Sequence, residues 1–274
     1  MRKRLYICGD SFSSISKKDK FKGTSWSEVL ANKLDWELVN LARPGISNGG
    51  IRLQIEKAIQ ERADFVFIVP TFPDRIELPG KIDPPQDILL AIKKKNKKNL
   101  IEFSERLPLF LPELDYGYDP TIGLSNIDYS NEGYRLISAP LIHLVEGSYK
   151  ATADNKGIRF LLKQYITMLY DPLWKKQNDQ WIIREAMFNL YDNDIPFSLD
   201  PGYLWSDEEF KKFLPNKIDK KYFRINKEET LRDKVEPYAI VLESVDDPGY
   251  HSLPENQDKI ADAYYFVIKQ YWTL

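Results

Sequence analysis

The chain has 274 residues, of which 43% are hydrophobic and 29% charged, and its 39 Lys and Arg nearly balance its 41 Asp and Glu. A chain of this length can bury a large core as one α/β domain with an insertion or as two domains, and we predict a single domain over 1–274. The formal net charge of −2 provides no general field that attracts nucleic acid or an anionic membrane, so we expect neither as a partner.

The single cysteine and the short apolar runs indicate the cellular compartment in which we expect the protein. The only cysteine, Cys8, excludes an intramolecular disulfide framework, and its place in an apolar run is typical of a small buried hydrophobe. The apolar run after the basic segment 1–4 is too short for a signal-peptide core, and no apolar stretch reaches the roughly 18 residues of a membrane span. We therefore expect a soluble, cytoplasmic protein and leave its oligomeric state open.

The first predicted element is a buried strand over 5–8, which Gly9, Asp10 and Ser11 end abruptly. Ligands of open α/β sheets bind at the carboxyl ends of the strands. The hydroxyl of Ser11 is therefore expected at the edge of the sheet where binding sites form.

Two further strand units follow within the first 70 residues. A capping box, Ser25 with Glu28, predicts the start of one helix, and Ser47 and Asn48 are alternative N-caps of the next. Alternation of strands and helices over this length predicts a doubly wound fold with a mainly parallel sheet. The predicted strands of these units are 37–42 and 64–69.

The regular pattern is lost between 79 and 150, where we predict an insertion or lid after the third strand. Its lysine cluster, 93–98, is interpreted as a solvated helix face. Its tyrosines are interpreted either as a lid or sugar-stacking surface or as loop packing, and both alternatives stay open.

Regular elements resume in the last part of the chain. Helical periodicity returns at about 155, and Asp171 followed by Pro172 predicts the start of a second helix in this part. That helix bears several apolar residues, Leu173, Trp174, Trp181, Ile182, Ala186, Met187 and Leu190. The remaining elements are predicted strands over 195–199 and 238–242, an irregular segment over 200–235, and a C-terminal helix behind a second capping box, Ser252 with Glu255.

Three short blocks stand out in this sequence: Gly9-Asp10-Ser11-Phe12, Asn40-Leu41-Ala42-Arg43-Pro44-Gly45 and Asp247-Pro248-Gly249-Tyr250-His251. Together they resemble the SGNH (GDSL-type) hydrolases, a family of esterases and acyl hydrolases whose nucleophile is the serine of the first block. The resemblance covers about the first 78 residues and the stretch from roughly 195 onward. Together with the βαβ pattern, it implies a three-layer αβα sandwich of flavodoxin-like topology.

The resemblance implies a catalytic triad in which His251 is the base for Ser11. The chain has one other histidine, His143, which lies in an apolar run and is interpreted as a core residue. The family commonly places an aspartate three residues before the histidine, and this position is Pro248 here. We predict Asp247 as the acid that orients His251, with Asp246 as the alternative.

The oxyanion hole that the resemblance implies is altered in this sequence. The family would use the backbone N–H groups of Ser11 and Gly45 and an asparagine side chain after the third strand, where this chain has Phe72. We predict that Asn48 replaces the missing donor, although capping a helix is an equally good interpretation of its place. The other nearby candidates are Thr71 and Arg75.

Other kinds of site find little support. Gly45-Ile46-Ser47-Asn48-Gly49 matches the G-x-S-x-G nucleophile elbow of α/β-hydrolases, but that fold needs several strands before its elbow, so Ser47 is assigned an N-cap or loop role. The sequence contains no H-E-x-x-H, no paired C-x-x-C and no phosphate-binding glycine motif, so we expect no metal and no cofactor.

The sequence therefore predicts serine-dependent, metal-independent hydrolysis of an ester through an acyl-Ser11 intermediate. The substrate would be an O-acyl or O-acetyl group on a carbohydrate, a lipid or a small molecule. The alternative is a binding or structural protein that keeps the SGNH fold with little or no catalytic activity. Pro248 and Phe72 are the residues that favour this alternative.

Overall fold

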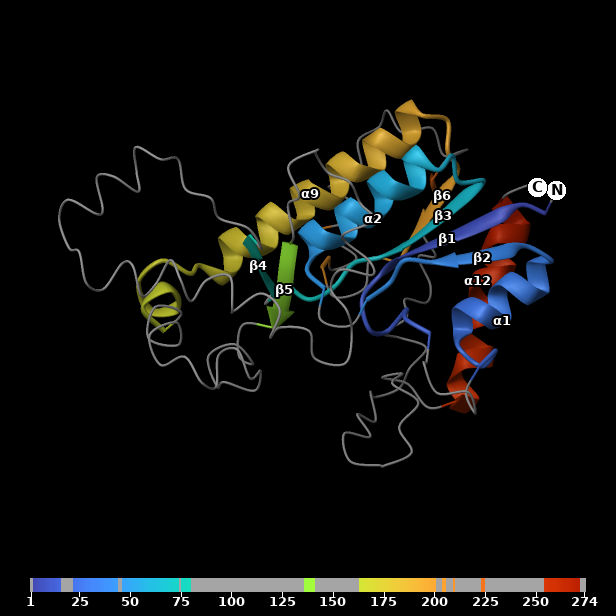
Figure 1. Ribbon diagram of the computed structural model, residues 1–274, viewed down its shortest axis with the longest axis horizontal. Coiled ribbons are helices and arrows are strands. Elements are labelled where there is room, and N and C mark those ends of the chain that lie inside the picture. Colours follow the sequence, from blue (N-terminus) through green and yellow to red (C-terminus); the bar gives the residue numbers. More distant parts are fainter. Residues whose placement is uncertain are drawn as a thin grey trace, which may run out of the picture. The chain divides into compact units, whose positions relative to one another are not determined.

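A five-stranded sheet organises the first of two compact units, which comprises residues 1–75 and 172–274 (Figure 1). The computed structural model describes residues 2–15, 22–43, 46–73, 75–79, 136–140, 163–200, 204–205, 209, 223–224 and 254–271. The spatial order of the strands is β2-β1-β3-β6-β7, and all four neighbouring pairs are parallel. The strands are β1 (Arg4–Gly9), β2 (Glu37–Asn40), β3 (Phe65–Val69), β6 (Phe197–Leu199) and β7 (Phe223–Arg224).

The direction of the chain across this sheet reverses next to β1. From β1 the chain moves outward to β2 and then returns to the opposite side of β1 for β3. When only the strands of this sheet are numbered along the chain, so that β6 is the fourth and β7 the fifth, their spatial order is 2-1-3-4-5. The carboxyl ends of β1 and β3 therefore flank the point of reversal, which is where open α/β sheets bind their ligands. An α/β fold with a parallel sheet is confirmed.

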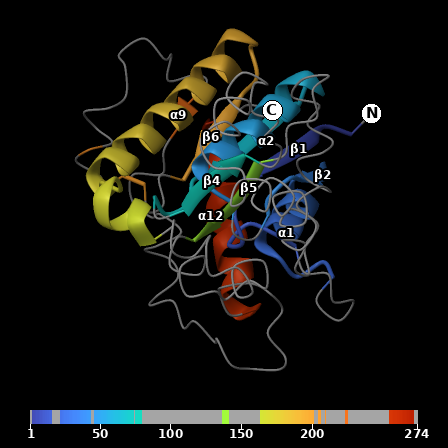
Figure 2. The same ribbon diagram turned by 60° about the vertical axis from the view of Figure 1, so that its left-hand side comes forward.

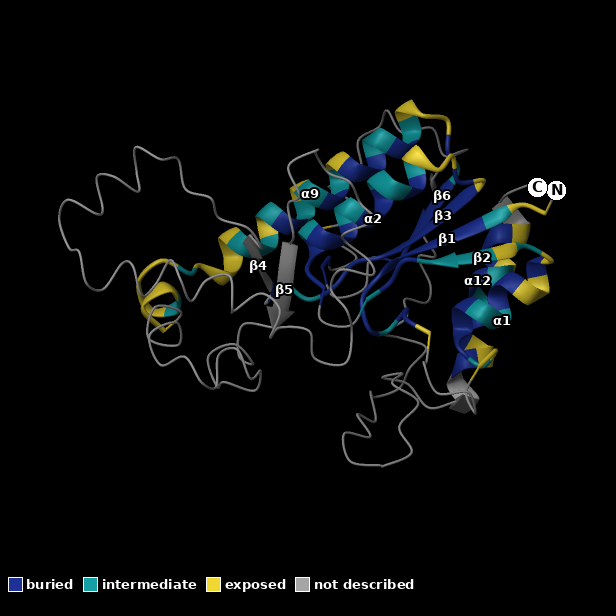
Figure 3. Ribbon diagram, viewed as in Figure 1, coloured by how far each residue is buried: buried dark blue, intermediate teal, exposed yellow. Residues whose placement is uncertain are grey.

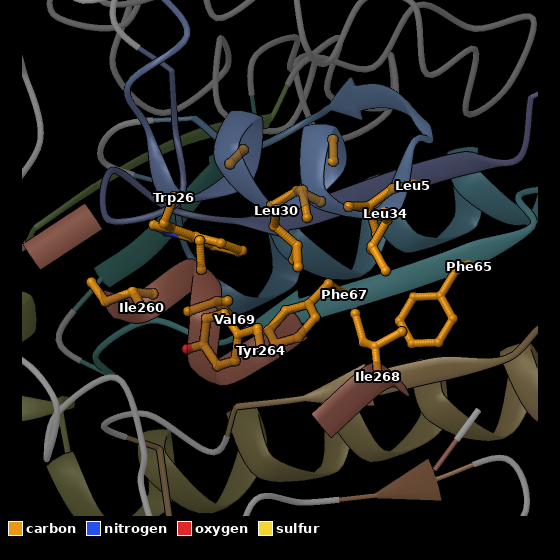
Figure 4. Close-up of a cluster of buried hydrophobic side chains, with 14 residues drawn as sticks. Leu5, Trp26, Leu30, Leu34, Phe65, Phe67, Val69, Ile260, Tyr264 and Ile268 are labelled. Carbon is orange, nitrogen blue, oxygen red and sulfur yellow. The ribbon is translucent and has the colours of Figure 1, made fainter. Parts of the chain in front are cut away.

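Two helices, α1 (Trp26–Leu34) and α12 (Pro254–Tyr271), cover one face of the sheet (Figure 4). The Tyr264 ring lies 4.3 Å from the Phe67 ring and 5.1 Å from the Trp26 ring, centroid to centroid. All residues of β1 beyond Arg4 and all residues of β3 are buried (Figure 3), as expected for central parallel strands. The buried cluster contains Leu5, Ile7, Trp26, Leu30, Ala31, Leu34, Ala42, Phe65, Phe67, Val69, Ile260, Ala261, Tyr264 and Ile268.

A second pair of helices, α2 (Asn48–Gln60) and α9 (Pro172–Asp192), packs together, and α2 also contacts β1 and β3 (Figure 2). The predicted helix at Asp171-Pro172 is thus confirmed, but its most N-terminal apolar residues do not form the buried face. Leu173, Trp174 and Trp181 are exposed. The buried residues of α9 are Asp179, Ile183, Ala186, Met187 and Leu190.

The local start signals read from the sequence agree with the structure. Ser25 and Glu28 form the predicted capping box of α1, in which the Ser25 hydroxyl accepts from the Glu28 N–H and the Glu28 carboxylate accepts from the Ser25 N–H. Of the two alternative caps of α2, Ser47 is the N-cap, and its hydroxyl accepts from the Gly50 N–H. The N-cap or loop role assigned to Ser47 is therefore confirmed.

The second unit, residues 76–171, falls between β3 and α9 in the sequence. The strands β4 (Arg75–Pro79) and β5 (Leu136–Pro140) form a two-stranded sheet, and residues 163–168 are helical. β7 lies in the segment over 200–235 that was expected to be irregular, so that expectation was wrong at this point. The predicted strand over 238–242 and the second capping box at Ser252 and Glu255 lie outside the described residues.

Candidate active site

Ser11 lies in a tight turn that directly follows β1. The Ser13 N–H donates to the Asp10 carbonyl at 3.1 Å, and the Phe12 N–H donates to Asp10 Oδ1 at 3.0 Å. The Ser14 hydroxyl donates to the Ser11 carbonyl at 3.0 Å. The Ser11 residue is only 4% exposed, and its hydroxyl has no hydrogen bond to any residue that the structure describes.

Contacts from α1 and β2 fix this turn on the sheet. The Trp26 indole N–H donates to the Phe12 carbonyl at 2.9 Å, and the Asn40 amide donates to the Ser13 carbonyl at 2.7 Å. Both donors belong to elements of the first unit, and both bond the backbone of the turn rather than its side chains. The turn is therefore held in one shape before any ligand arrives, which is what a catalytic loop requires.

The end of β1 lies so close to its neighbours that a side chain at Gly9 would force a local shift. A Cβ atom on Gly9 would lie 2.8 Å from Ser13 Oγ and 3.1 Å from the Val69 carbonyl oxygen. The buried Gln54 side chain of α2 accepts from the Gly9 N–H at 2.7 Å and donates to the Gly9 carbonyl at 3.3 Å. The glycine of the first block thus has a steric reason to be there.

The Asp10 carboxylate joins the loops that follow β1, β2 and β3. Its Oδ2 atom accepts from the Thr71 hydroxyl at 2.6 Å and lies 3.1 Å from Arg75 Nη1, which also donates to the Ile46 carbonyl at 3.0 Å. Asp10 is 1% exposed and Arg75 is 7% exposed, so this is a buried ion pair whose loss of hydration is compensated by further hydrogen bonds. One carboxylate and one guanidinium therefore set the relative positions of three loops.

Asn48 extends this network to α9. Its amide nitrogen donates to the Thr71 carbonyl and to Asp179 Oδ2, both at 3.0 Å, and its amide oxygen accepts from the Thr71 N–H at 2.9 Å. Asp179 is buried and pairs with Lys175, whose Nζ lies 2.5 Å from Asp179 Oδ1. Both amide hydrogens of Asn48 thus have protein acceptors, and a role in the oxyanion hole would require one of them to be released.

Sequence reasoning missed three charged residues that lie in the Asn48 network or at the carboxyl edge of the sheet. Asp179 and Lys175 support Asn48, and Asp200 follows β6, where its carboxylate accepts from the Tyr264 hydroxyl. Asp200 is buried, and its N–H donates to the Ile68 carbonyl at 2.9 Å. A signal existed for Asp200, because an acidic residue directly after an apolar strand repeats the pattern of Asp10 after β1.

Other predicted site residues lie outside the described part of the chain. These are Gly45, Asp246, Asp247, Pro248 and His251, as well as the alternative histidine His143. The pairing of Ser11 with His251 therefore stays a prediction. Among the described residues, no group of three or more His, Cys, Asp or Glu side chains could hold a metal ion, and no helix could cross a membrane.

The cysteine next to the site is a structural residue. Cys8 is fully buried in β1, and burial raises the pKa of its thiol well above the usual range. The thiol is therefore protonated and is not a candidate nucleophile. The interpretation of Cys8 as a small buried hydrophobe is confirmed.

Comparisons with known proteins do not identify a family for this chain. Neither a scan against protein-family models nor a search of curated proteins finds a match.

Proposed function

We propose that this chain is a serine-dependent, metal-independent ester hydrolase related to the SGNH (GDSL-type) family. Its substrate would carry an O-acyl or O-acetyl group on a carbohydrate, a lipid or a small molecule. The observation that carries the proposal is the place of Ser11, in a braced turn at the carboxyl end of β1 beside the reversal of the strand order. A hydroxyl there is fixed in space yet has no hydrogen bond to a described residue.

The architecture that accompanies this proposal is a three-layer αβα sandwich of flavodoxin-like topology. The 2-1-3-4-5 strand order supports it, as do the helix pair α1 and α12 and the second pair α2 and α9. We assign residues 79–150 to an insertion or lid after the third strand. The division of the chain into two units, with 76–171 between parts of the first, supports that assignment.

The proposed reaction proceeds through an acyl-enzyme. Ser11 Oγ attacks the carbonyl carbon of the ester while its proton passes to His251, and the carbonyl π pair moves onto oxygen. The pair then returns, the bond to the alkoxy oxygen breaks, and His251 protonates the departing alcohol. Water repeats the sequence on acyl-Ser11 and releases the acid. Asp247, or Asp246, holds the imidazole in the required tautomer.

The oxyanion would be stabilised first by backbone donors. The N–H groups of Ser11 and Gly45 fill this role in the proposal. The amide of Asn48, predicted as the side-chain donor, would contribute only if it gave up its bond to Asp179 or to the Thr71 carbonyl. The Asp10 network would keep the loops that carry the backbone donors in register.

Covalent capture tests the proposal. The folded protein is treated with an aryl fluorophosphonate and the modified residue is located by mass spectrometry. We expect labelling of Ser11 in the wild type and in Ser47→Ala, and none in Ser11→Ala. Labelling that disappears only with Ser47→Ala would contradict the assignment of the nucleophile.

The alternative is a binding or structural protein with the same fold and little or no catalysis. Two observations favour it: Ser11 is 4% exposed, and the hydrogens of Asn48 are engaged. A folded wild type that neither reacts with fluorophosphonates nor hydrolyses aryl esters would support this alternative against the hydrolase.

A further inference from the structure

The oxyanion hole proposed above lacks a side-chain donor, because Phe72 stands where the family has its asparagine. Three polar residues are candidates to replace it. They are Asn48 at the start of α2, and Thr71 and Arg75 after the third strand. Each residue has a limited number of hydrogens to give. The question is therefore which of the three has hydrogens that no protein acceptor already takes.

Two of the three have given all their side-chain hydrogens to the protein. Thr71 donates its hydroxyl hydrogen to Asp10 Oδ2 and its N–H to Asn48 Oδ1. Asn48 donates one amide hydrogen to the Thr71 carbonyl and the other to Asp179. Releasing either would take a hydrogen bond away from a buried carboxylate or carbonyl, which is costly.

Arg75 differs from both. A guanidinium carries five N–H hydrogens, and every hydrogen bond or ion pair that Arg75 makes with described residues runs through Nη1. The hydrogens on Nε and Nη2 have no acceptor in the described part of the chain. Nε and Nη2 of Arg75 are not among the fully buried polar atoms of the described residues that lack a partner, so their hydrogens reach solvent and are open to an anionic acceptor that arrives with the substrate.

The anchoring of Arg75 also joins it to the residues that neighbour the proposed backbone donors in the sequence. Nη1 binds the carboxylate of Asp10, the residue before Ser11, and the carbonyl of Ile46, the residue after Gly45. The two segments expected to supply backbone N–H groups thus meet at one guanidinium nitrogen. Since the fork is planar and rigid, fixing Nη1 also restricts where Nε and Nη2 can lie.

We propose that Arg75 supplies the missing side-chain donor of the oxyanion hole, an assignment that rests on the proposed hydrolase function. When Ser11 Oγ attacks, the carbonyl π pair moves onto oxygen and the new anion accepts from the free N–H groups of Arg75. The bond from Ser11 and the transfer of its proton to His251 are unchanged. Arg75 acts only by donating hydrogen bonds to the new anion, and it gives up no proton in this step.

Asp10 has a defined part in this arrangement. It neutralises Arg75 before the reaction, so burial of the cation is tolerated in the resting protein. In the tetrahedral intermediate the guanidinium then faces two anions, the Asp10 carboxylate on Nη1 and the substrate oxygen on the rest of the fork. Arg75 is thus a catalytic residue in this proposal, and Asp10 is a positioning residue.

A double-mutant cycle distinguishes an oxyanion donor from a residue that only holds the loops in place. The kcat for p-nitrophenyl acetate is measured with the full chain for the wild type, Asp10→Asn, Arg75→Met and the double variant. We expect Arg75→Met to lower kcat about 10²–10³-fold, the usual effect of removing one oxyanion donor, with a much smaller change in KM. Adding Arg75→Met to Asp10→Asn should lower kcat by about 10² again.

Equal kcat values for Asp10→Asn and the double variant would overturn the proposal, because Arg75 would then act only through Asp10. The matched control is Arg52→Met, which removes an arginine that pairs with Glu56 and Glu185 on the helices. A fall in kcat as large in this control would also overturn it. If Arg75→Met alone fails to fold, the comparison of Asp10→Asn with the double variant still decides. The double variant contains no unpaired buried charge, and in Asp10→Asn the guanidinium keeps its hydrogen bond to the Ile46 carbonyl.

The role of Arg75 can be tested separately from the proposed hydrolase activity. A wild type that hydrolyses the ester and is labelled at Ser11, with kcat unchanged in Arg75→Met, refutes the role of Arg75 alone. A wild type with neither activity nor labelling refutes both. A lower kcat in Asn48→Ala that circular dichroism shows to be folded, at full activity of Arg75→Met, would return the donor role to Asn48.

Discussion

Replacing Asn48 with alanine should destabilise the fold strongly, because three buried groups lose their partner at once. The variant leaves the Thr71 N–H, the Thr71 carbonyl and Asp179 Oδ2 without the bonds they make at 2.9 to 3.0 Å. Each unpaired buried group costs about 1–3 kcal/mol. Asp179 keeps its pair with Lys175, so we expect a total loss of about 3–5 kcal/mol in the free energy of unfolding.

Urea denaturation followed by circular dichroism measures this loss. The matched control is Asn193→Ala, because the exposed Asn193 side chain makes one hydrogen bond, to the Asn189 carbonyl at 2.7 Å. We expect the control to change the free energy of unfolding by less than about 0.5 kcal/mol. A loss below about 1 kcal/mol in Asn48→Ala, or a loss no larger than in the control, would refute the reasoning.

Asn48→Asp gives an independent check of the same contact. The new carboxylate would face the Asp179 carboxylate, and like charges at hydrogen-bond distance favour sharing one proton. The variant should therefore gain stability relative to the wild type as the pH falls from 7 towards 4. A stability difference that does not change with pH would show that the two side chains do not meet.

Three smaller predictions concern other parts of the first unit. Gly9→Ala should lower the free energy of unfolding by about 1–3 kcal/mol, because its Cβ would overlap Ser13 Oγ and the Val69 carbonyl; an unchanged urea midpoint would contradict the close approach. Ser25→Ala should cost about 1 kcal/mol through loss of the α1 cap, measured in the same way. Burial, then the hydrogen bond to Glu61, raises the pKa of Tyr6 to about 12. Tyr6 in the unfolded chain loses its proton near pH 10, so protonated Tyr6 stabilises the folded chain fully below that pH and progressively less as the pH rises towards 12. Tyr6→Phe should therefore reduce the fall in the free energy of unfolding between pH 10 and 12.

The elements that the sequence predicted well are those set by local physical chemistry. Continuous apolar runs identified β1 and β3, and the side-chain caps at Ser25 and Ser47 marked the starts of α1 and α2. These signals depend on a few neighbouring residues. They do not depend on which distant segment packs against them.

The features that were missed depend on contacts between distant segments. Asp179 is polar at a buried position of α9 because its partner Asn48 lies 131 residues earlier in the chain. The β7 strand, Phe223–Arg224, is too short to show a period-two pattern, and only its pairing with β6 makes it a strand. The polar network around Asp10 is likewise assembled from three loops, which no local pattern reveals.

The reaction of Ser11 with an activated ester tests the central claim most directly. The folded protein is mixed with excess p-nitrophenyl acetate, and both the early release of p-nitrophenol and the mass of the quenched chain are measured. We predict a burst of about one p-nitrophenol per chain and one acetyl group on Ser11, absent from Ser11→Ala. No burst, or an acetyl group on another residue that persists in Ser11→Ala, would contradict the account.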